Sequence, residues 1–236
     1  MGWMDAIKAR KALLLHQKGN EAGARAEYEK LYAGGYIAAS YLLPYSVLLL
    51  REGGEENYQK VKALLKQAEK APDLDAQRRQ ELLMDYAVAQ YKLGEIGKAI
   101  ELLEEAHLKT PCGLIYQALG YLYVEAGEKD KALSYNLEAL DYDDEDSIVL
   151  DNLGQTYYRL FNDPAKARPY FEKAHEIKEN QIDTLYFLSR YDLSEGKKQD
   201  ALAKLELAVQ GRFSPLNYVS REQVTAEIDA LRKEIS

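Results

Sequence analysis

Alanine recurs along this chain at an interval of about 34 residues. Ala99, Ala132, Ala167 and Ala201 are 33, 35 and 34 residues apart, and a second alanine follows each of them by seven residues. Repetition at this interval is the signature of repeat proteins, in which each short unit packs only on its neighbours. The sequence therefore predicts a stack of similar units.

Each unit has the hydrophobic pattern of two helices. Residues 116–125 place apolar and aromatic side chains at positions i, i+3, i+4 and i+7, and residues 130–140 carry a second helical stripe. Gly127 separates the two segments, as a glycine that ends a helix does. Gly120 is expected to face small residues of the second segment, which lets two helices approach closely. Strand-type alternation is nearly absent, so the predicted fold class is all-α.

The spacing of these residues resembles the tetratricopeptide repeat (TPR) family. That family's pattern is W-x2-L-G-x2-Y, followed by A-x3-F-x2-A and then P. The best-matching unit, with one residue inserted near Phe161–Pro164, carries Leu150, Leu153, Gly154, Tyr157, Ala167, Phe171 and Ala174. The preceding unit keeps the pattern but has Asn136 where the aromatic residue belongs. Two flanking units match more weakly, and two N-terminal units are more diverged.

The resemblance implies a right-handed superhelical solenoid of about six helical hairpins, taken as a single domain over residues 1–236. Ser220 and Gln223 form a capping-box pattern before an amphipathic segment, which predicts a C-terminal helix covering the apolar edge of the last hairpin. The expected hairpins span about 3–34, 36–72, 78–111, 113–146, 147–181 and 182–213, and the capping helix spans 219–236.

The charge of the chain is concentrated in its second half. Residues 113–236 hold 15 Lys and Arg against 23 Asp and Glu, which accounts for the whole net charge of −8. This balance argues against a nucleic-acid or anionic-membrane surface and favours a basic or neutral partner. Acidic, solvated helix faces would give the same balance. The chain has no run of about 18 apolar residues, so no direct membrane insertion is expected.

No catalytic or metal-binding pattern is complete in this sequence. His175 and Glu176 begin like a zinc-protease helix, but Glu179 stands where the second histidine is needed. The acidic run 141–146 lacks the glycine of a calcium loop and is expected to be a solvated loop that caps the next helix. We therefore expect no cofactor, no metal and no enzymatic activity.

The family resemblance also implies a binding surface. In TPR proteins the first helix of each hairpin lines a concave groove that holds a peptide or a partner helix. Carried onto the matching positions, this groove is lined by Met84, Val88, Tyr91, Gln117, Tyr121, Val124, Asp151, Asn152, Gln155, Tyr158, Tyr186, Arg190 and Leu193. Tyrosine suits such a surface because it offers a large contact area and a hydrogen-bonding tip. The alternative is that several of these tyrosines pack between hairpins.

Asn152 has two possible roles. Peptide-binding TPR domains often place an asparagine at this position to contact the ligand backbone, but a lone asparagine here is more often a helix-packing residue. The cations of the chaperone-type carboxylate clamp are missing here: Gln117 and Tyr121 stand on the preceding first helix, and Asp183 and Phe187 on the following one. Binding of chaperone C-termini through this groove is therefore not expected.

The resemblance implies a non-enzymatic scaffold for protein–protein interaction. The alternative is a self-assembling, homo-oligomeric repeat protein, docked through Trp3, Met4 and Ile7 at one end and Val224, Ile228 and Leu231 at the other. No signal peptide is visible in the first residues, so the cytoplasm is the expected compartment. A chain cut just after a membrane anchor would look the same.

Overall fold

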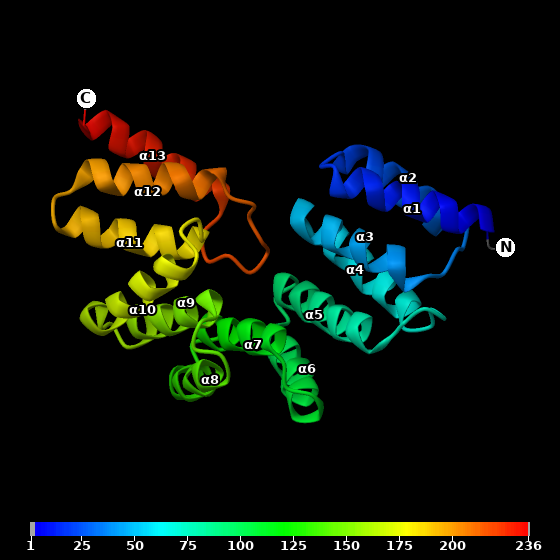
Figure 1. Cartoon of the computed structure of the whole chain (residues 1–236), viewed down its shortest axis with the longest axis horizontal. Coiled ribbons are helices and arrows are strands. Elements are labelled where there is room, and N and C mark those ends of the chain that lie inside the picture. Colours follow the sequence, from blue (N-terminus) through cyan, green and yellow to red (C-terminus); the bar gives the residue numbers. More distant parts are fainter. Residues whose placement is uncertain (1–2, 236) are drawn as a thin grey trace. The chain divides into compact units, whose positions relative to one another are not determined.

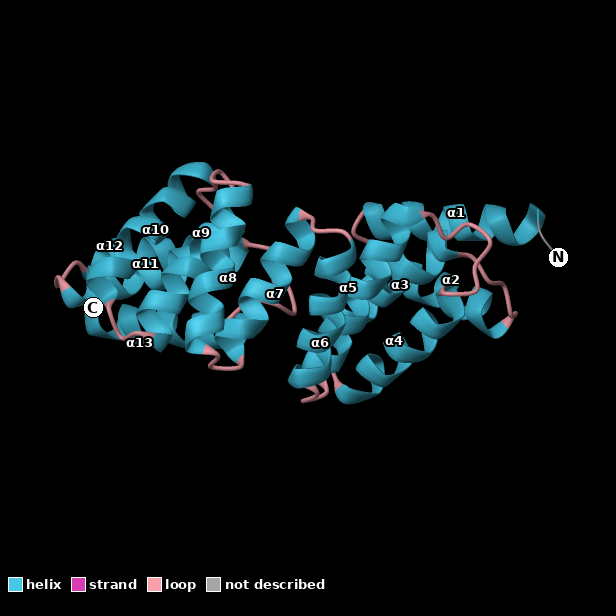
Figure 2. Cartoon of the chain, turned by 90° about the horizontal axis from the view of Figure 1, so that it is seen from below, coloured by secondary structure: helices cyan, strands magenta, loops and turns pink. Residues whose placement is uncertain are grey.

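The computed structural model describes residues 3–235 (Figure 1), and over that range it contains thirteen α-helices, one π-helical turn and no strand (Figure 2). The chain divides into two compact units, with the boundary between Ala106 and His107. Each unit is built from consecutive helices joined by short turns, as the repeat pattern predicts.

The first unit contains three pairs of helices. Their bounds are α1 Trp3–Gln17, α2 Glu21–Ala33, α3 Ala39–Glu52, α4 Glu55–Ala68, α5 Ala76–Lys92 and α6 Ile96–Lys109, whose last residues lie beyond the boundary. Helix α3 packs against α1, α2, α4 and α5, and its buried side chains include Tyr41, Tyr45 and Leu49. It therefore lies at the centre of this unit.

The second unit contains three further pairs and a final helix. Their bounds are α7 Gly113–Glu125, α8 Lys129–Tyr142, α9 Ser147–Gln155, the π-helical turn η1 Thr156–Leu160, α10 Pro164–Ile177, α11 Ile182–Ser194, α12 Lys198–Gln210 and α13 Arg221–Ile235. The first helices α7 and α9 pack on each other, and α10 connects to α11 through direct contacts. The expected six hairpins and C-terminal helix are confirmed.

One residue in the left-handed region ends the first helix of five hairpins. It lies five positions before a fully buried alanine of the second helix and is Gly19, Gly94, Gly127, Asn162 or Gly196. Glycine adopts this conformation without a Cβ penalty, and asparagine is among the few other residues that tolerate it. Asn162, with a φ of 52°, is thus the local equivalent of a glycine.

The one-residue insertion of the fifth hairpin lies in its first helix. The sequence pattern placed this insertion near Phe161–Pro164, but η1 at Thr156–Leu160 absorbs it as a π-helical turn. A π-helical turn accommodates one extra residue while the flanking helical hydrogen bonds continue. The loop before Pro164 can therefore keep the geometry of the other hairpins.

The glycines of the repeat pattern lie where two helices touch. A Cβ added to Gly154 would lie 2.6 Å from Cε1 of Phe171. At Gly120 the neighbour is Asn136, whose Oδ1 would lie 2.1 Å from such a Cβ. The expected close approach is therefore present, although the opposing residue is the amide of Asn136 rather than an alanine.

Hydrogen bonds one repeat apart tie successive hairpins together. Ser147 Oγ donates to Gln181 Oε1 at 2.7 Å, and Gln181 Nε2 donates back to the Ser147 carbonyl at 2.9 Å. In the first unit, the backbone N–H groups of Ala39 and Ser40 donate to Asp73 at 2.7 and 3.0 Å. These bonds set the register in which each repeat meets the next.

The final helix covers the last hairpin. Ser220 N donates to Gln223 Oε1 at 2.7 Å and Gln223 N donates to Ser220 Oγ at 3.2 Å, which confirms the reciprocal capping box. Val224, Ile228 and Leu231 are buried against α11 and α12. This face is therefore not available to dock a second copy, contrary to the expectation for the oligomer hypothesis.

Candidate functional site

The predicted groove residues divide between the two units. Met84, Val88 and Tyr91 lie on α5 in the first unit, and the others lie in the second unit on α7, α9, η1 and α11. The buried members are Val88, Tyr121, Val124, Asp151, Asn152 and Gln155, and the partly buried members are Met84, Tyr91, Gln117, Tyr158, Tyr186, Arg190 and Leu193. We describe the second-unit surface formed by α7, α9, η1 and α11 as the first-helix face.

Helices α7 and α9 meet through amide side chains. Asn152 Nδ2 donates to the Gln117 carbonyl at 2.9 Å, so Asn152 bonds the preceding helix within the protein. Gln117 Nε2 donates to Asp146 Oδ2 at 2.6 Å, and Asp146 also accepts the Ile148 and Val149 N–H groups that begin α9. Of the two roles considered for Asn152, helix packing is the one that this geometry supports.

A buried carboxylate, Asp151, lies between α9 and α11. Its Oδ1 accepts from Thr184 Oγ1 at 2.6 Å and its Oδ2 accepts from Gln155 Nε2 at 2.7 Å. Burial and the nearby charge of Asp183 hold the pKa of Asp151 above the ordinary aspartate value, against the effect of these hydrogen bonds.

Asp183 is the second buried carboxylate, one repeat further along. It accepts from Asn217 Nδ2 at 3.1 Å, from Tyr218 N at 3.0 Å and from Val219 N at 3.3 Å. Burial raises its pKa, while the three N–H donors and the charge of Arg159 oppose the rise. In the sequence, Asp183 stands out only as a mismatch to a clamp cation.

Arg159 enters the first-helix face because of the π-helical turn. It lies three residues before Asn162, as Val124 lies before Gly127, so it takes the groove position assigned to Tyr158. Its Nη1 donates to Glu125 Oε1 at 2.6 Å and to Gln155 Oε1 at 2.8 Å.

Tyr158 lies instead among aromatic rings. Its ring centroid is 5.2 Å from Phe187, 5.9 Å from Tyr191 and 6.4 Å from Phe171. The one-residue insertion was visible in the sequence. If the extra residue is placed before Tyr158 and not after it, the repeat pattern puts Arg159 at the groove position.

The last two predicted groove residues contact the C-terminal helix. Arg190 forms an ion pair with Glu227 of α13, and Tyr186 Oη donates to the same carboxylate at 3.3 Å. The Arg190 guanidinium also lies 4.2 Å from the centroid of the Tyr186 ring. Helix α13 therefore engages the part of the first-helix face that α11 contributes.

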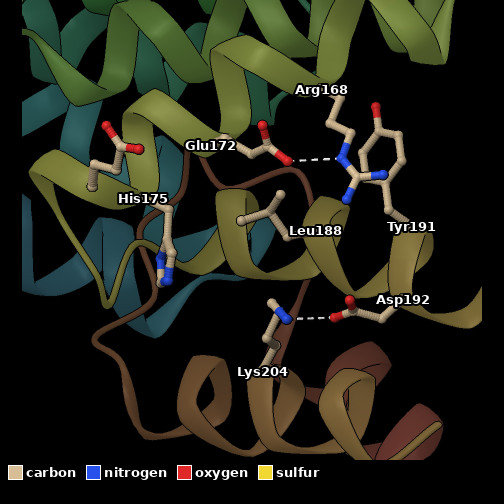
Figure 3. A pocket seen from close by; sticks show the side chains of 8 residues that line it. Arg168, Glu172, His175, Leu188, Tyr191, Asp192 and Lys204 are labelled. Atoms are coloured by element: carbon tan, nitrogen blue, oxygen red, sulfur yellow. Dashed lines mark hydrogen bonds and ion pairs between the residues drawn. The ribbon is translucent and has the colours of Figure 1, made fainter. Parts of the chain in front are cut away.

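A separate cavity of about 290 Å³ lies among α10, α11 and α12 and is lined by none of the predicted groove residues (Figure 3). Figure 3 shows two ion pairs among its charged side chains, Arg168 with Glu172 and Lys204 with Asp192; the remaining carboxylate of the lining is that of Glu176. His175 also lines it, and its Nδ1 is buried without a hydrogen-bond partner. The cavity presents little uncompensated charge to a ligand.

Within residues 3–235, no three His, Cys, Asp or Glu side chains lie close enough together to hold a metal ion. In the same range no helix combines the length and the hydropathy needed to cross a bilayer.

Solved structures resemble this arrangement of helices. A tetratricopeptide repeat protein from Parabacteroides merdae is 13% identical, with 97% of this chain and 84% of that chain covered and a TM-score of 0.78. TTC0263, a thermophilic TPR protein from Thermus thermophilus, is 20% identical, with 83% and 100% covered and a TM-score of 0.65. YrrB, described as a TPR protein with an unusual peptide-binding site, is 21% identical, with 75% and 88% covered and a TM-score of 0.52.

Comparison by sequence finds no relative of this chain, whereas comparison by structure does. No sequence-family description matches the chain, and no curated protein matches it. The solved structures share its succession of helical hairpins at identities of 21% or less, which is similarity of fold. The chain therefore has the fold of tetratricopeptide-repeat proteins.

Proposed function

We propose that this protein is a non-enzymatic scaffold that binds a peptide segment of a partner protein on the first-helix face of its second unit. The observation that carries the proposal is the pair of buried carboxylates, Asp151 and Asp183, beside Arg159. Burying like charges is costly, so a fold that only needed packing would gain from neutral side chains there. Asp183 already accepts two backbone N–H groups, those of Tyr218 and Val219, which supports a role for this network in holding a peptide backbone.

The charge of this face suggests the chemistry of the partner. The face carries three acids, Asp151, Asp183 and Glu125. The guanidinium of Arg159 pairs with Glu125 and acts on Asp183, and Arg190 is already paired with Glu227. A basic or neutral peptide is therefore favoured over an acidic one or a nucleic acid.

A random peptide library displayed on phage, selected against the full chain, tests this proposal. We expect the selected peptides to carry a neutral or positive charge and to lose at least about tenfold in affinity when Glu125 is replaced by Lys, because this change reverses one of the three acids of the face. Glu179→Lys, at an exposed position after α10, is the matched control and should leave binding unchanged. Peptides that bind both variants as well as the wild type would place the site elsewhere, and a selection that yields no binder would contradict the proposal.

A second candidate is self-association through α1. Trp3, Met4 and Ile7 are 80%, 67% and 50% exposed, which is unusual for large apolar side chains on one helix. Of the two apolar faces considered for docking a second copy, the face of α13 is buried and the face of α1 is exposed. Light scattering tests it: we expect a dimer that Trp3→Glu converts to a monomer, and a wild-type monomer at high concentration would refute it.

A further inference from the structure

The segment between α12 and α13 folds back onto the first-helix face. In Figure 1 it runs away from α12 and passes the start of α11 before it returns to α13. Two successive backbone N–H groups of this segment, those of Tyr218 and Val219, donate to the carboxylate of Asp183 at 3.0 and 3.3 Å. Asn217 Nδ2 donates to the same carboxylate at 3.1 Å.

The side chain of Tyr218 occupies an aromatic slot on this face. Its ring stacks on Phe187 with a centroid distance of 5.2 Å and an interplanar angle of 23°, and its centroid is 6.0 Å from that of Tyr186. The guanidinium of Arg159 lies 4.1 Å from its centroid. Tyr218 nevertheless remains 38% exposed, so it rests on the surface and is not part of the core.

Two hydrogen bonds within the segment stabilise its shape independently of its contacts with the face. The N–H of Ser214 donates to Asn217 Oδ1 at 2.6 Å, and the N–H of Asn217 donates to the Ser214 carbonyl at 3.0 Å. These bonds close a turn around Pro215, which limits the entropy lost when the segment docks. We call residues 214–218 the strap.

The strap can leave the face without unfolding α13. Val219, immediately after it, is 4% exposed, and Val224 and Ile228 are packed in the core of the last hairpin. The capping box at Ser220 also holds the start of α13 independently of the strap. Detachment would break the bonds to Asp183 from Asn217 and Tyr218 and expose the slot at Phe187.

These contacts are those by which a receptor reads a short peptide. A carboxylate that accepts consecutive N–H groups recognises a backbone whatever its sequence, and a slot of two aromatic rings and a guanidinium recognises an aromatic side chain. Asp183 and Arg159 also lie within the face to which we assign partner binding, so the strap and a partner would compete for the same groups.

We infer that the strap is an intramolecular occupant of the binding face, and that the external ligand is a basic or neutral peptide presenting an aromatic side chain beside N–H donors that replace those of Asn217 and Tyr218 on Asp183. This inference rests on the proposed function. The strap must leave before the partner segment binds, so it lowers the apparent affinity by the fraction of molecules in which the face is open.

The first test uses the strap sequence as a free probe. A fluorescein-labelled peptide GRFSPLNYVS, which corresponds to residues 211–220, is titrated into the full chain and into a variant with residues 214–218 replaced by Gly-Ser-Gly-Ser-Gly. We expect the variant to bind at least about tenfold more tightly by fluorescence anisotropy. Circular dichroism checks that both chains are equally helical, and Tyr218→Ala serves as a milder opening variant.

Two controls separate occupancy of the slot from unspecific binding. The chain variant Tyr218→Phe keeps the ring and should bind the probe as weakly as the wild type. A probe with alanine in place of its tyrosine should lose at least about tenfold in affinity for the opened chain. Equal binding of the probe to the wild-type and opened chains, or no binding to either opened variant, would overturn the inference.

The library-selected peptides distinguish this inference from the proposed function. If they bind the wild-type and opened chains equally well, the strap is not an occupant of their site, although the scaffold function stands. If they bind the opened chain at least about tenfold more tightly, both are supported. A failure of the library with both chains contradicts the scaffold function, while the labelled probe still reports whether the strap occupies the face.

Discussion

The ring of Phe171 lies directly against the backbone of Gly154, where an added Cβ would come within 2.6 Å of Cε1. Phe171 is fully buried and stacks on Phe187 at 4.8 Å, so it has little room to move away. This contact joins both helices of the fifth hairpin to the first helix of the sixth. The tight approach therefore links the packing inside one repeat to the packing between two.

Substitution of Gly154 should destabilise the protein. We expect Gly154→Leu to lower the free energy of unfolding by about 1–3 kcal/mol or more, because overpacking forces the Phe171 ring off its rotamer or separates the helices. Gly97→Leu is the control, since Gly97 lies in α6 with nothing near its Cβ position and leucine is a better helix former. Urea titration measures both, and equal stability of the two variants would refute the assigned contact.

Asn162, the left-handed turn residue of the fifth hairpin, should be replaceable by glycine without loss of stability, but not by alanine. We expect Asn162→Ala to reduce stability by about 1 kcal/mol, because alanine pays the full cost of a positive φ. Asn162→Gly should leave the melting temperature nearly unchanged, as glycine occupies the same position in four other hairpins. If alanine is tolerated as well as glycine, the turn does not constrain this residue.

Asp73 should act as the N-terminal cap of a helix in the preceding repeat. Helix α3 follows Ala38, which has no side-chain acceptor, and its Ala39 and Ser40 N–H groups bond to Asp73 instead. We expect Asp73→Ala to cost about 0.5–2 kcal/mol by thermal denaturation. Asp144→Ala, at an exposed loop position of the second unit, is the control, and an equal effect of the two changes would contradict the capping role.

The stability of the first unit should depend on Asp85 near neutral pH. Burial raises the pKa of Asp85 to about 7. The hydrogen bond that Ser46 Oγ donates to this carboxylate and the charge of Arg51 both lower the pKa, but they do not offset the effect of burial. Between pH 4 and 7 the folded protein therefore holds a proton that the unfolded chain releases, so stability falls as pH rises through this range.

An uncharged side chain should remove this dependence. We expect Asp85→Asn to flatten the pH profile of the melting temperature between pH 4 and 7 and to raise stability at pH 7.5, because the amide needs no proton to remain neutral. Asp141→Asn, on an exposed residue, should keep the wild-type slope. A slope that survives Asp85→Asn would show that another group is responsible.

Much of the fold can be predicted from the spacing of small residues in the sequence. Alanine and glycine repeat because only they fit where two helices cross, so Gly154 and Ala167 identify the hairpin before any coordinates exist. The capping box at Ser220 is equally local, since its two hydrogen bonds join residues three apart. Interactions of this kind depend on short stretches of chain and are therefore visible in the sequence.

The composition of the first-helix face was only partly predictable. Positions such as Gln117 and Gln155 follow from the repeat register, but the exchange of Tyr158 for Arg159 depends on where the extra residue is absorbed. The family pattern shows that one residue is added without showing which helical turn widens. That choice is made by packing, because Tyr158 gains contacts with Phe171 and Phe187 when the turn is placed at Thr156–Leu160.

The sequence alone determined the helical hairpins, their turns and the acidic character of the second half, because each depends on residue type and on neighbours within one repeat. Only the tertiary structure placed Tyr218 over Arg159 and joined its N–H to Asp183. Those residues are separated by more than one helix, and the loop that carries Tyr218 has no repeat pattern. Its position is decided by hydrogen bonds and ring contacts to residues that are close to it only in the packed fold.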